Sequence, residues 1–119
     1  METYKELALE IAEFIDDKKG EDIIILDLRG KSSLTDFFVI ATGLNDRNTA
    51  AIAHHVEDML EKKGIEIHHK EGHRAGEWVV LDYIDIIVHI FNEEKREYYS
   101  IERIWQDAER IEPQFAKVN

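Results

Sequence analysis

Apolar residues recur at three- and four-residue spacing in three segments of the chain, which is the spacing of amphipathic helices. The first segment runs from Tyr4 to Lys19 and should end at Gly20. The second should be capped by Asn45 or Asp46 and should end before Gly64. The third starts at residue 100 and continues to residue 111, before Pro113. The pattern therefore predicts three helices.

Between these segments lie short apolar runs that are typical of strands. We expect strands at residues 22–28, 37–42, 65–67, 78–83 and 86–91, and an exposed loop at residues 68–76. The first two should pair as a hairpin-like unit, and the last two as a tight hairpin whose turn lacks the usual Asn-Gly pair. The predicted fold is α/β (α+β), with a single mixed sheet of about five strands covered by helices, in the order α-β-β-α-β-β-β-α.

The two faces of the strand at residues 78–83 should differ, since successive side chains of a strand point in opposite directions. Trp78, Val80 and Asp82 share one face, and an unpaired aspartate is costly to bury. We therefore expect this row nearer the surface, and Val79 and Leu81 against the helices. Trp78 should then matter for binding more than for stability.

Charge and composition limit the kinds of partner and cellular location that the chain is suited to. The 119 residues include 26 acidic and 15 basic ones, a net charge of −11. Such a chain fits a basic protein partner and argues for little direct contact with nucleic acid, whose phosphates are bound by lysine and arginine. The absence of cysteine suits a reducing compartment. Because the apolar runs are far too short to span a bilayer, we expect a single cytoplasmic domain over residues 1–119.

Two kinds of site remain open from the residue pattern. Asp82, Asp85 and His89 lie on or beside the predicted hairpin and could form an acid–base site. The alternative is that the two aspartates accept hydrogen bonds from the turn backbone while His89 is a hydrogen-bonded core residue. The six histidines do not form a set with metal-ligand spacing, so no metal is expected.

The second kind of site is a protein-docking surface. Tyrosine and tryptophan residues with polar tips cluster after residue 77, among acidic residues. Aromatic residues anchor many protein interfaces. An apolar centre surrounded by acids is suited to a basic partner, and acidic charge would accelerate the encounter.

Several segments resemble a known family, the Iojap-like ribosomal silencing factors. The likeness is carried by Asp27–Gly43 (DLRGKSSLTDFFVIATG), Glu71–Tyr83 (EGHRAGEWVVLDY), Asp85–Phe91 (DIIVHIF) and Ile101–Trp105 (IERIW). The resemblance implies a translational repressor that binds the large ribosomal subunit through ribosomal protein fourteen and blocks joining of the small subunit when nutrients are short. It also implies a nucleotidyltransferase-like fold and a link to large-subunit assembly.

Transferase chemistry is not expected, because the sequence departs from the catalytic pattern of that superfamily. A Gly-Ser turn followed by an Asp-x-Asp pair would be needed, whereas Ala41-Thr-Gly43 leads into Leu44 and no such pair follows. The prediction is a protein that is not an enzyme and has no cofactor. The alternative is a nucleotidyltransferase-like enzyme or nucleotide-binding protein that uses Asp82, Asp85 and His89.

The expected partner-binding surface surrounds the strand at residues 78–83. It comprises Trp78, Val80, Asp82, Tyr83, Asp85, Glu93 and Tyr98. When the protein is free, a homodimer should cover this apolar surface.

Overall fold

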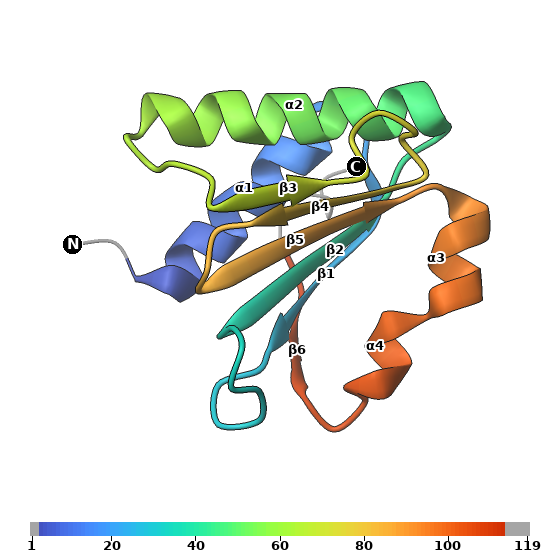
Figure 1. Cartoon of the computed structure of the whole chain (residues 1–119). Coiled ribbons are helices and arrows are strands. Elements are labelled where there is room, and N and C mark those ends of the chain that lie inside the picture. The colour runs from blue at the N-terminus through green and yellow to red at the C-terminus, as the bar shows by residue number, and fades with distance from the viewer. Residues whose placement is uncertain (1–2, 114–119) are drawn as a thin grey trace, which may run out of the picture.

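A six-stranded mixed sheet forms the centre of the structure, in the strand order β3-β4-β5-β2-β1-β6 (Figure 1). The structure is a computed structural model, and it describes residues 3–113. β2 and β5 are parallel, and the other neighbouring strands are antiparallel. The elements are α1 (Tyr4–Asp17), β1 (Glu21–Asp27), β2 (Phe37–Thr42), α2 (Asp46–Lys62), β3 (His69–Glu71), β4 (Trp78–Asp82), β5 (Ile86–Phe91), α3 (Glu93–Tyr99), α4 (Ile101–Ile104) and β6 (Glu109–Ile111).

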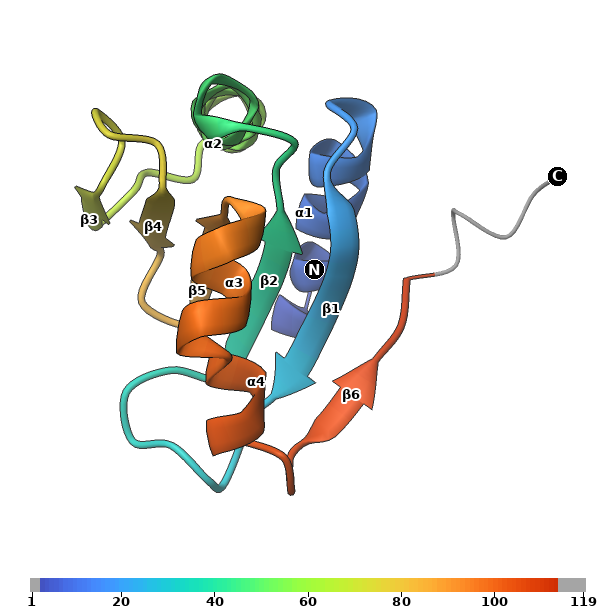
Figure 2. The same cartoon turned by 90° about the vertical axis from the view of Figure 1, so that its right-hand side faces the viewer.

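The helices α1 and α2 pack on one face of this sheet (Figure 2). Thr3 caps α1 through a capping box with Glu6, and Asn45 caps α2 by accepting a hydrogen bond from the backbone N–H of Asn48. The buried stripes of both helices meet inward-facing strand residues in the larger core. This core includes Ile11, Ile15, Ile52, Val56, Leu60, Val79, Leu81, Val88 and Ile90.

The opposite face of the sheet is covered by α3, α4 and the segment that follows them (Figure 1). This cover is light, because α3 buries none of its own described side chains and α4 buries only Ile101. Arg96 of α3 fastens it, donating hydrogen bonds to Thr42 Oγ1 at 2.8 Å and to the Glu102 carboxylate at 3.1 Å. A smaller core forms beneath, around Leu26, Leu28, Ile40 and Phe91.

Much of the predicted architecture is confirmed. The mixed α+β class, the first two helices, the hairpin-like pairing of β1 with β2 and the hairpin of β4 with β5 all hold. Val79 and Leu81 have no exposed surface, while Trp78, Val80 and Asp82 are half-buried. The faces of β4 were therefore assigned correctly.

The predicted strand at residues 65–67 is wrong, and the third strand lies within the predicted loop at residues 68–76. Ile65 and Ile67 pack against the larger core without joining the sheet. Pairing starts where the His68 N–H donates to the Asp82 carbonyl, and β3 follows with His69 opposite Asp82. β3 lies at the edge of the sheet, so backbone hydrogen bonds suffice and its side chains are polar.

The predicted third helix is confirmed only at its start, where α4 covers Ile101–Ile104 after Ser100. A further short helix, α3, precedes it, and Ser100 between the two has a left-handed backbone (φ +42°) that interrupts the helical path. Residues 109–111 form β6 instead, with Ile111 opposite Ile25 of β1. The sheet therefore has six strands instead of about five.

Candidate functional site

The outer face of β4 brings Trp78, Val80 and Asp82 into one row. The antiparallel register places Trp78 opposite Phe91, Val80 opposite His89 and Asp82 opposite Ile87. Directly opposed residues of an antiparallel pair project from the same face. The row is therefore continuous with β5 residues beneath α3.

An aromatic cluster fills the covered end of this face, and we define it as Phe38, Trp78, His89, Phe91, Tyr99 and Trp105. The Trp78 ring stacks on Phe91 with centroids 4.9 Å apart and lies 4.5 Å from the Tyr99 ring. The Trp78 indole N–H donates to His89 Nδ1 at 3.1 Å. Phe38 packs edge-on against His89 at 4.5 Å.

These contacts correct one expectation about Trp78. Its indole lies against Phe91 and Tyr99 and satisfies a ring nitrogen of His89. It therefore stabilises the smaller core as well as presenting a half-exposed edge. A change at Trp78 should affect both folding and any binding at this face.

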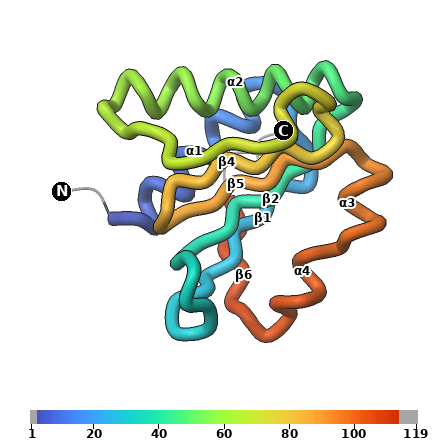
Figure 3. Tube along the Cα trace, in the orientation of Figure 1, coloured from blue at the N-terminus to red at the C-terminus, as the bar shows by residue number. Residues whose placement is uncertain are grey.

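Asp82 and Asp85 bracket the β4–β5 turn. The Asp82 carboxylate accepts a hydrogen bond from the Ile84 N–H at 2.7 Å, as expected for a turn-forming aspartate. The Asp85 carboxylate is hydrogen-bonded to the Tyr4 hydroxyl and raises the pKa of that phenol. Figure 3 shows the start of α1 beside this turn. The turn is thus tied to the N-terminal helix.

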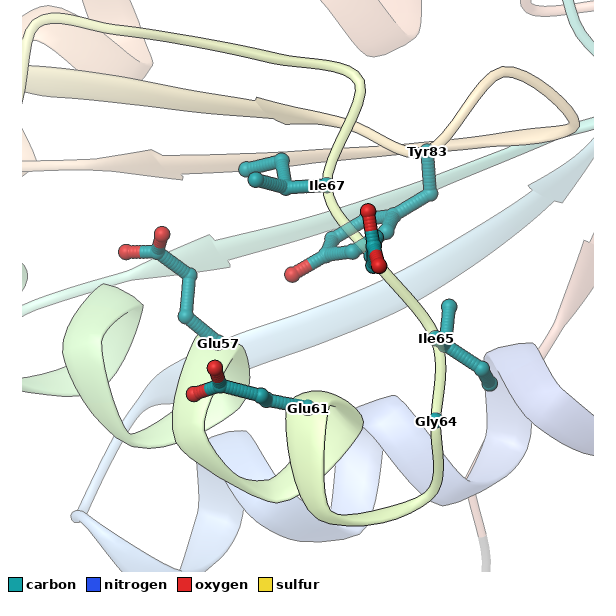
Figure 4. A pocket seen from close by; sticks show the side chains of 7 residues that line it. Glu57, Glu61, Gly64, Ile65, Ile67 and Tyr83 are labelled. Atoms are coloured by element: carbon teal, nitrogen blue, oxygen red, sulfur yellow. The ribbon is translucent and has the colours of Figure 1, made fainter.

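Tyr83 lies on the other side of the sheet, apart from the remaining predicted contact residues. It packs against the larger core and lines a cavity of about 380 Å³ (Figure 4). Burial raises the pKa of the Tyr83 phenol, and the nearby Glu57 carboxylate raises it further. Other acidic residues around the cavity are Glu61 and Glu66.

Glu93 and Tyr98 lie on α3, above the aromatic cluster. Glu93 is exposed in the first turn of the helix, where its charge is favourable to the helix dipole. Tyr98 is 76% exposed, and its ring meets Tyr99 at 4.9 Å. Since Tyr99 contacts Trp78, a continuous aromatic path leads from the sheet to the exposed Tyr98 ring.

The structure does not assemble Asp82, Asp85 and His89 into an acid–base site. Asp82 bonds the turn backbone, Asp85 bonds Tyr4, and His89 bonds Trp78. Within residues 3–113, no hydrogen bond joins any two of the three. Nor do the described residues contain a group of three or more histidines and carboxylates that could hold a metal ion.

His89 is held as a neutral side chain. Burial lowers its pKa to about 4, and Nε2 has no hydrogen-bond partner in the described part of the chain. Because Nδ1 accepts from Trp78, the neutral ring carries its proton on Nε2. This agrees with the core-residue interpretation of His89, although only one ring nitrogen is bonded.

A pH dependence of stability follows from this pKa. The unfolded histidine titrates near 6.5, so its contribution is complete above that pH and is lost as the pH falls toward about 4. We expect wild type to lose up to about 1.4 kcal/mol more per pH unit in this window than His89→Asn. Urea denaturation between pH 7 and 4.5 measures the slopes. Equal slopes for wild type and His89→Asn would contradict the assignment.

Three residues near the site were not among the predicted contacts. Tyr99 connects Trp78 to Tyr98, Tyr4 bonds Asp85, and Ile84 is exposed at the tip of the β4–β5 turn. The signal for Ile84 was present in the sequence, since an apolar residue stands where a tight hairpin favours asparagine or glycine. The other two depend on tertiary contacts.

No helix among residues 3–113 is long and apolar enough to cross a bilayer.

Comparisons with solved structures agree with this fold. A crystal structure of a Chromobacterium violaceum protein is 37% identical, with a TM-score of 0.83, over 99% of this chain and 95% of that one. A crystal structure of a Bacillus halodurans protein is 34% identical, with a TM-score of 0.79, over 92% of this chain and 99% of that one. The architecture is therefore shared along nearly the whole chain.

Sequence comparisons identify the relationship. The family described as "Ribosomal silencing factor during starvation" matches residues 1–119. The Bacillus subtilis protein named Ribosomal silencing factor RsfS is 40% identical over 93 residues, 78% of this chain and 79% of that protein. The chloroplastic Protein Iojap of Arabidopsis thaliana is 31% identical over 91% of this chain and 45% of its own length. A full-length match, these relatives and the common fold together show that the chain belongs to the ribosomal silencing factor family.

Proposed function

We propose that the protein represses translation by binding the large ribosomal subunit through ribosomal protein fourteen, in a position that blocks joining of the small subunit. Family membership supports the ribosomal role. The observation that carries the choice of surface is the half-buried outer row of β4, continued by exposed aromatic rings on α3. The ribosomal partner implies action in the cytoplasm.

The proposed contact surface has the make-up of a docking site. Trp78 and Val80 supply half-buried apolar area, and Tyr98 supplies an exposed ring. Asp82, Asp85 and Glu93 supply negative charge around them. Because Tyr83 faces the larger core, its part in this surface is limited to supporting the strand end.

Charge supports a basic partner. With a net charge of −11, the protein repels phosphate backbones and attracts the basic proteins that bind them. Docking on a ribosomal protein lets the factor reach the subunit with little direct nucleic-acid contact. The steering component of such binding should weaken as salt screens the charges.

We also propose that the protein acts without catalysis. Asp82, Asp85 and His89 each bond a different neighbour, and each bond serves the turn or the core. Wild type should therefore show no nucleotidyl transfer, and Asp82→Asn and Asp85→Asn should show none either. Transfer by wild type that either substitution abolishes would favour the enzyme alternative.

Sedimentation with separated ribosomal subunits tests the proposal. The protein should pellet with large subunits and not with small ones, and pre-bound protein should reduce the formation of whole ribosomes. The association rate should fall at least several-fold between about 50 mM and about 500 mM salt. Equal pelleting with both subunits, or an association rate independent of salt, would contradict it.

A second copy of this chain is the other proposed partner. In the free protein the same partly exposed apolar face has no ribosomal cover, and a two-fold dimer would bury it. Light scattering of the purified protein, measured without ribosomal subunits, should give the mass of a dimer. A monomer at high concentration would remove this proposal and leave ribosome binding intact.

A further inference from the structure

The β4–β5 turn holds an isoleucine in an unusual backbone conformation. Ile84 has φ +74°, in the left-handed region that β-branched residues very rarely adopt. The Asp85 N–H donates to the Tyr83 carbonyl at 2.9 Å, so Ile84 is the central residue of a three-residue γ-turn. A γ-turn with positive φ is a strained arrangement even for more permissive residues.

Several hydrogen bonds hold this conformation in place. The Ile84 N–H donates to the Asp82 carboxylate at 2.7 Å, and the Tyr83 N–H donates to the Ile86 carbonyl at 2.9 Å. The Asp85 carbonyl accepts from the N–H groups of both Asp36 and Phe37, each at 3.1 Å. The turn is therefore fixed from both flanking strands and from the start of β2.

The strained residue contributes little to the folded protein. The Ile84 side chain is 54% exposed, and it lies outside both core clusters of the described residues. Glycine at this position would avoid the strain, and asparagine would reduce it. Neither the turn nor the core therefore accounts for an isoleucine here.

We infer that Ile84 is an apolar contact residue for the basic ribosomal protein that this chain binds, projected by the strained turn beyond the end of β4. Strained positions are concentrated at functional sites, and this one carries an exposed apolar side chain. Its sequence neighbours within the turn include Asp82 and Asp85, so the tip combines an apolar centre with negative charge. That combination is complementary to an apolar patch on the partner protein that is bordered by lysine or arginine.

This inference rests on the proposed function. It adds Ile84 to the proposed contact surface, which otherwise consists of the six predicted contact residues other than Tyr83. It assigns Ile84 a role in binding, and not in catalysis or in folding. A residue kept for binding alone should weaken binding when it is replaced, while its replacement by glycine relieves strain. The two effects have opposite signs, which a merely structural role would not produce.

Ile84→Gly tests the inference with two readouts. The melting temperature should rise by about 4 °C, because glycine adopts positive φ without strain. Binding to isolated large subunits should weaken at least tenfold. Lys19→Gly is the matched control, since Lys19 also has positive φ (+69°) in an exposed turn, between α1 and β1. It should raise the melting temperature similarly and leave binding unchanged.

Ile84→Asn excludes added turn flexibility as the cause. Asparagine accepts the left-handed conformation but lacks the apolar side chain, so this variant should also bind at least tenfold more weakly. Wild-type affinity in either Ile84 variant would overturn the inference while leaving the proposed function standing. Failure of wild type itself to bind large subunits would instead refute the proposed function.

Discussion

Leu81→Ala is expected to lower the free energy of unfolding by about 3–4 kcal/mol, the range for a fully buried leucine whose loss leaves a cavity. Leu81 has no exposed surface and belongs to the larger core between the sheet and α2. It lies opposite Val88 of β5 and Lys70 of β3. The neighbouring strands therefore limit how far the backbone can move to fill the space.

Urea denaturation of the purified protein measures this effect. Val80→Ala is the matched control, because Val80 is adjacent in β4 but projects from the half-exposed face. Its loss should be about 1 kcal/mol, since less apolar surface returns to water. A larger loss for Val80→Ala than for Leu81→Ala would contradict the assignment of the two faces.

The central strands could be predicted because burial shows directly in their composition. The two parallel neighbours, β2 and β5, lie in the middle of the sheet and consist largely of apolar residues. Such strands are covered on both faces and read as continuous apolar runs. Residue alternation was also enough to assign the faces of β4.

The edges of the sheet could not be predicted in the same way. β3 has the sequence His-Lys-Glu and β6 has Glu-Arg-Ile, neither of which shows a strand pattern. Both are edge strands that the sheet recruits through backbone hydrogen bonds. Ile111 matched a helical spacing but is opposite Ile25 of β1, so tertiary pairing overrode the local period.

The candidate site shows the same division. Alternation placed Trp78, Val80 and Asp82 together, and turn chemistry predicted the role of Asp82. The ring contact of Tyr99 with Trp78 depends on how α3 returns over the sheet, a segment for which no helix was expected. The strain at Ile84 is likewise visible only in the backbone angles.

Trp78→Ala should have two large effects, of which the structure predicts the first. Stability should fall by about 2–3 kcal/mol, because removal of the indole ends its stacking on Phe91 and its tilted contact with Tyr99 and leaves His89 Nδ1 without a donor. Under the proposed function, binding to ribosomal protein fourteen should also weaken by about 2 kcal/mol, or roughly thirtyfold, as for an interface anchor.

Tyr98→Ala separates these two effects, because Tyr98 lies at the exposed end of the same aromatic path. Its ring contacts Tyr99 and is 76% exposed, so its removal should change stability by less than about 0.5 kcal/mol. If the aromatic path is the docking surface, Tyr98→Ala should still weaken binding several-fold. Binding is measured without urea, at a temperature where both the Trp78 and the Tyr98 variants remain folded. If Trp78→Ala binds more weakly but Tyr98→Ala keeps wild-type affinity, the aromatic path is not the docking surface. The effect of Trp78→Ala would then come from its role in the core, and the interface would lie nearer the β4–β5 turn.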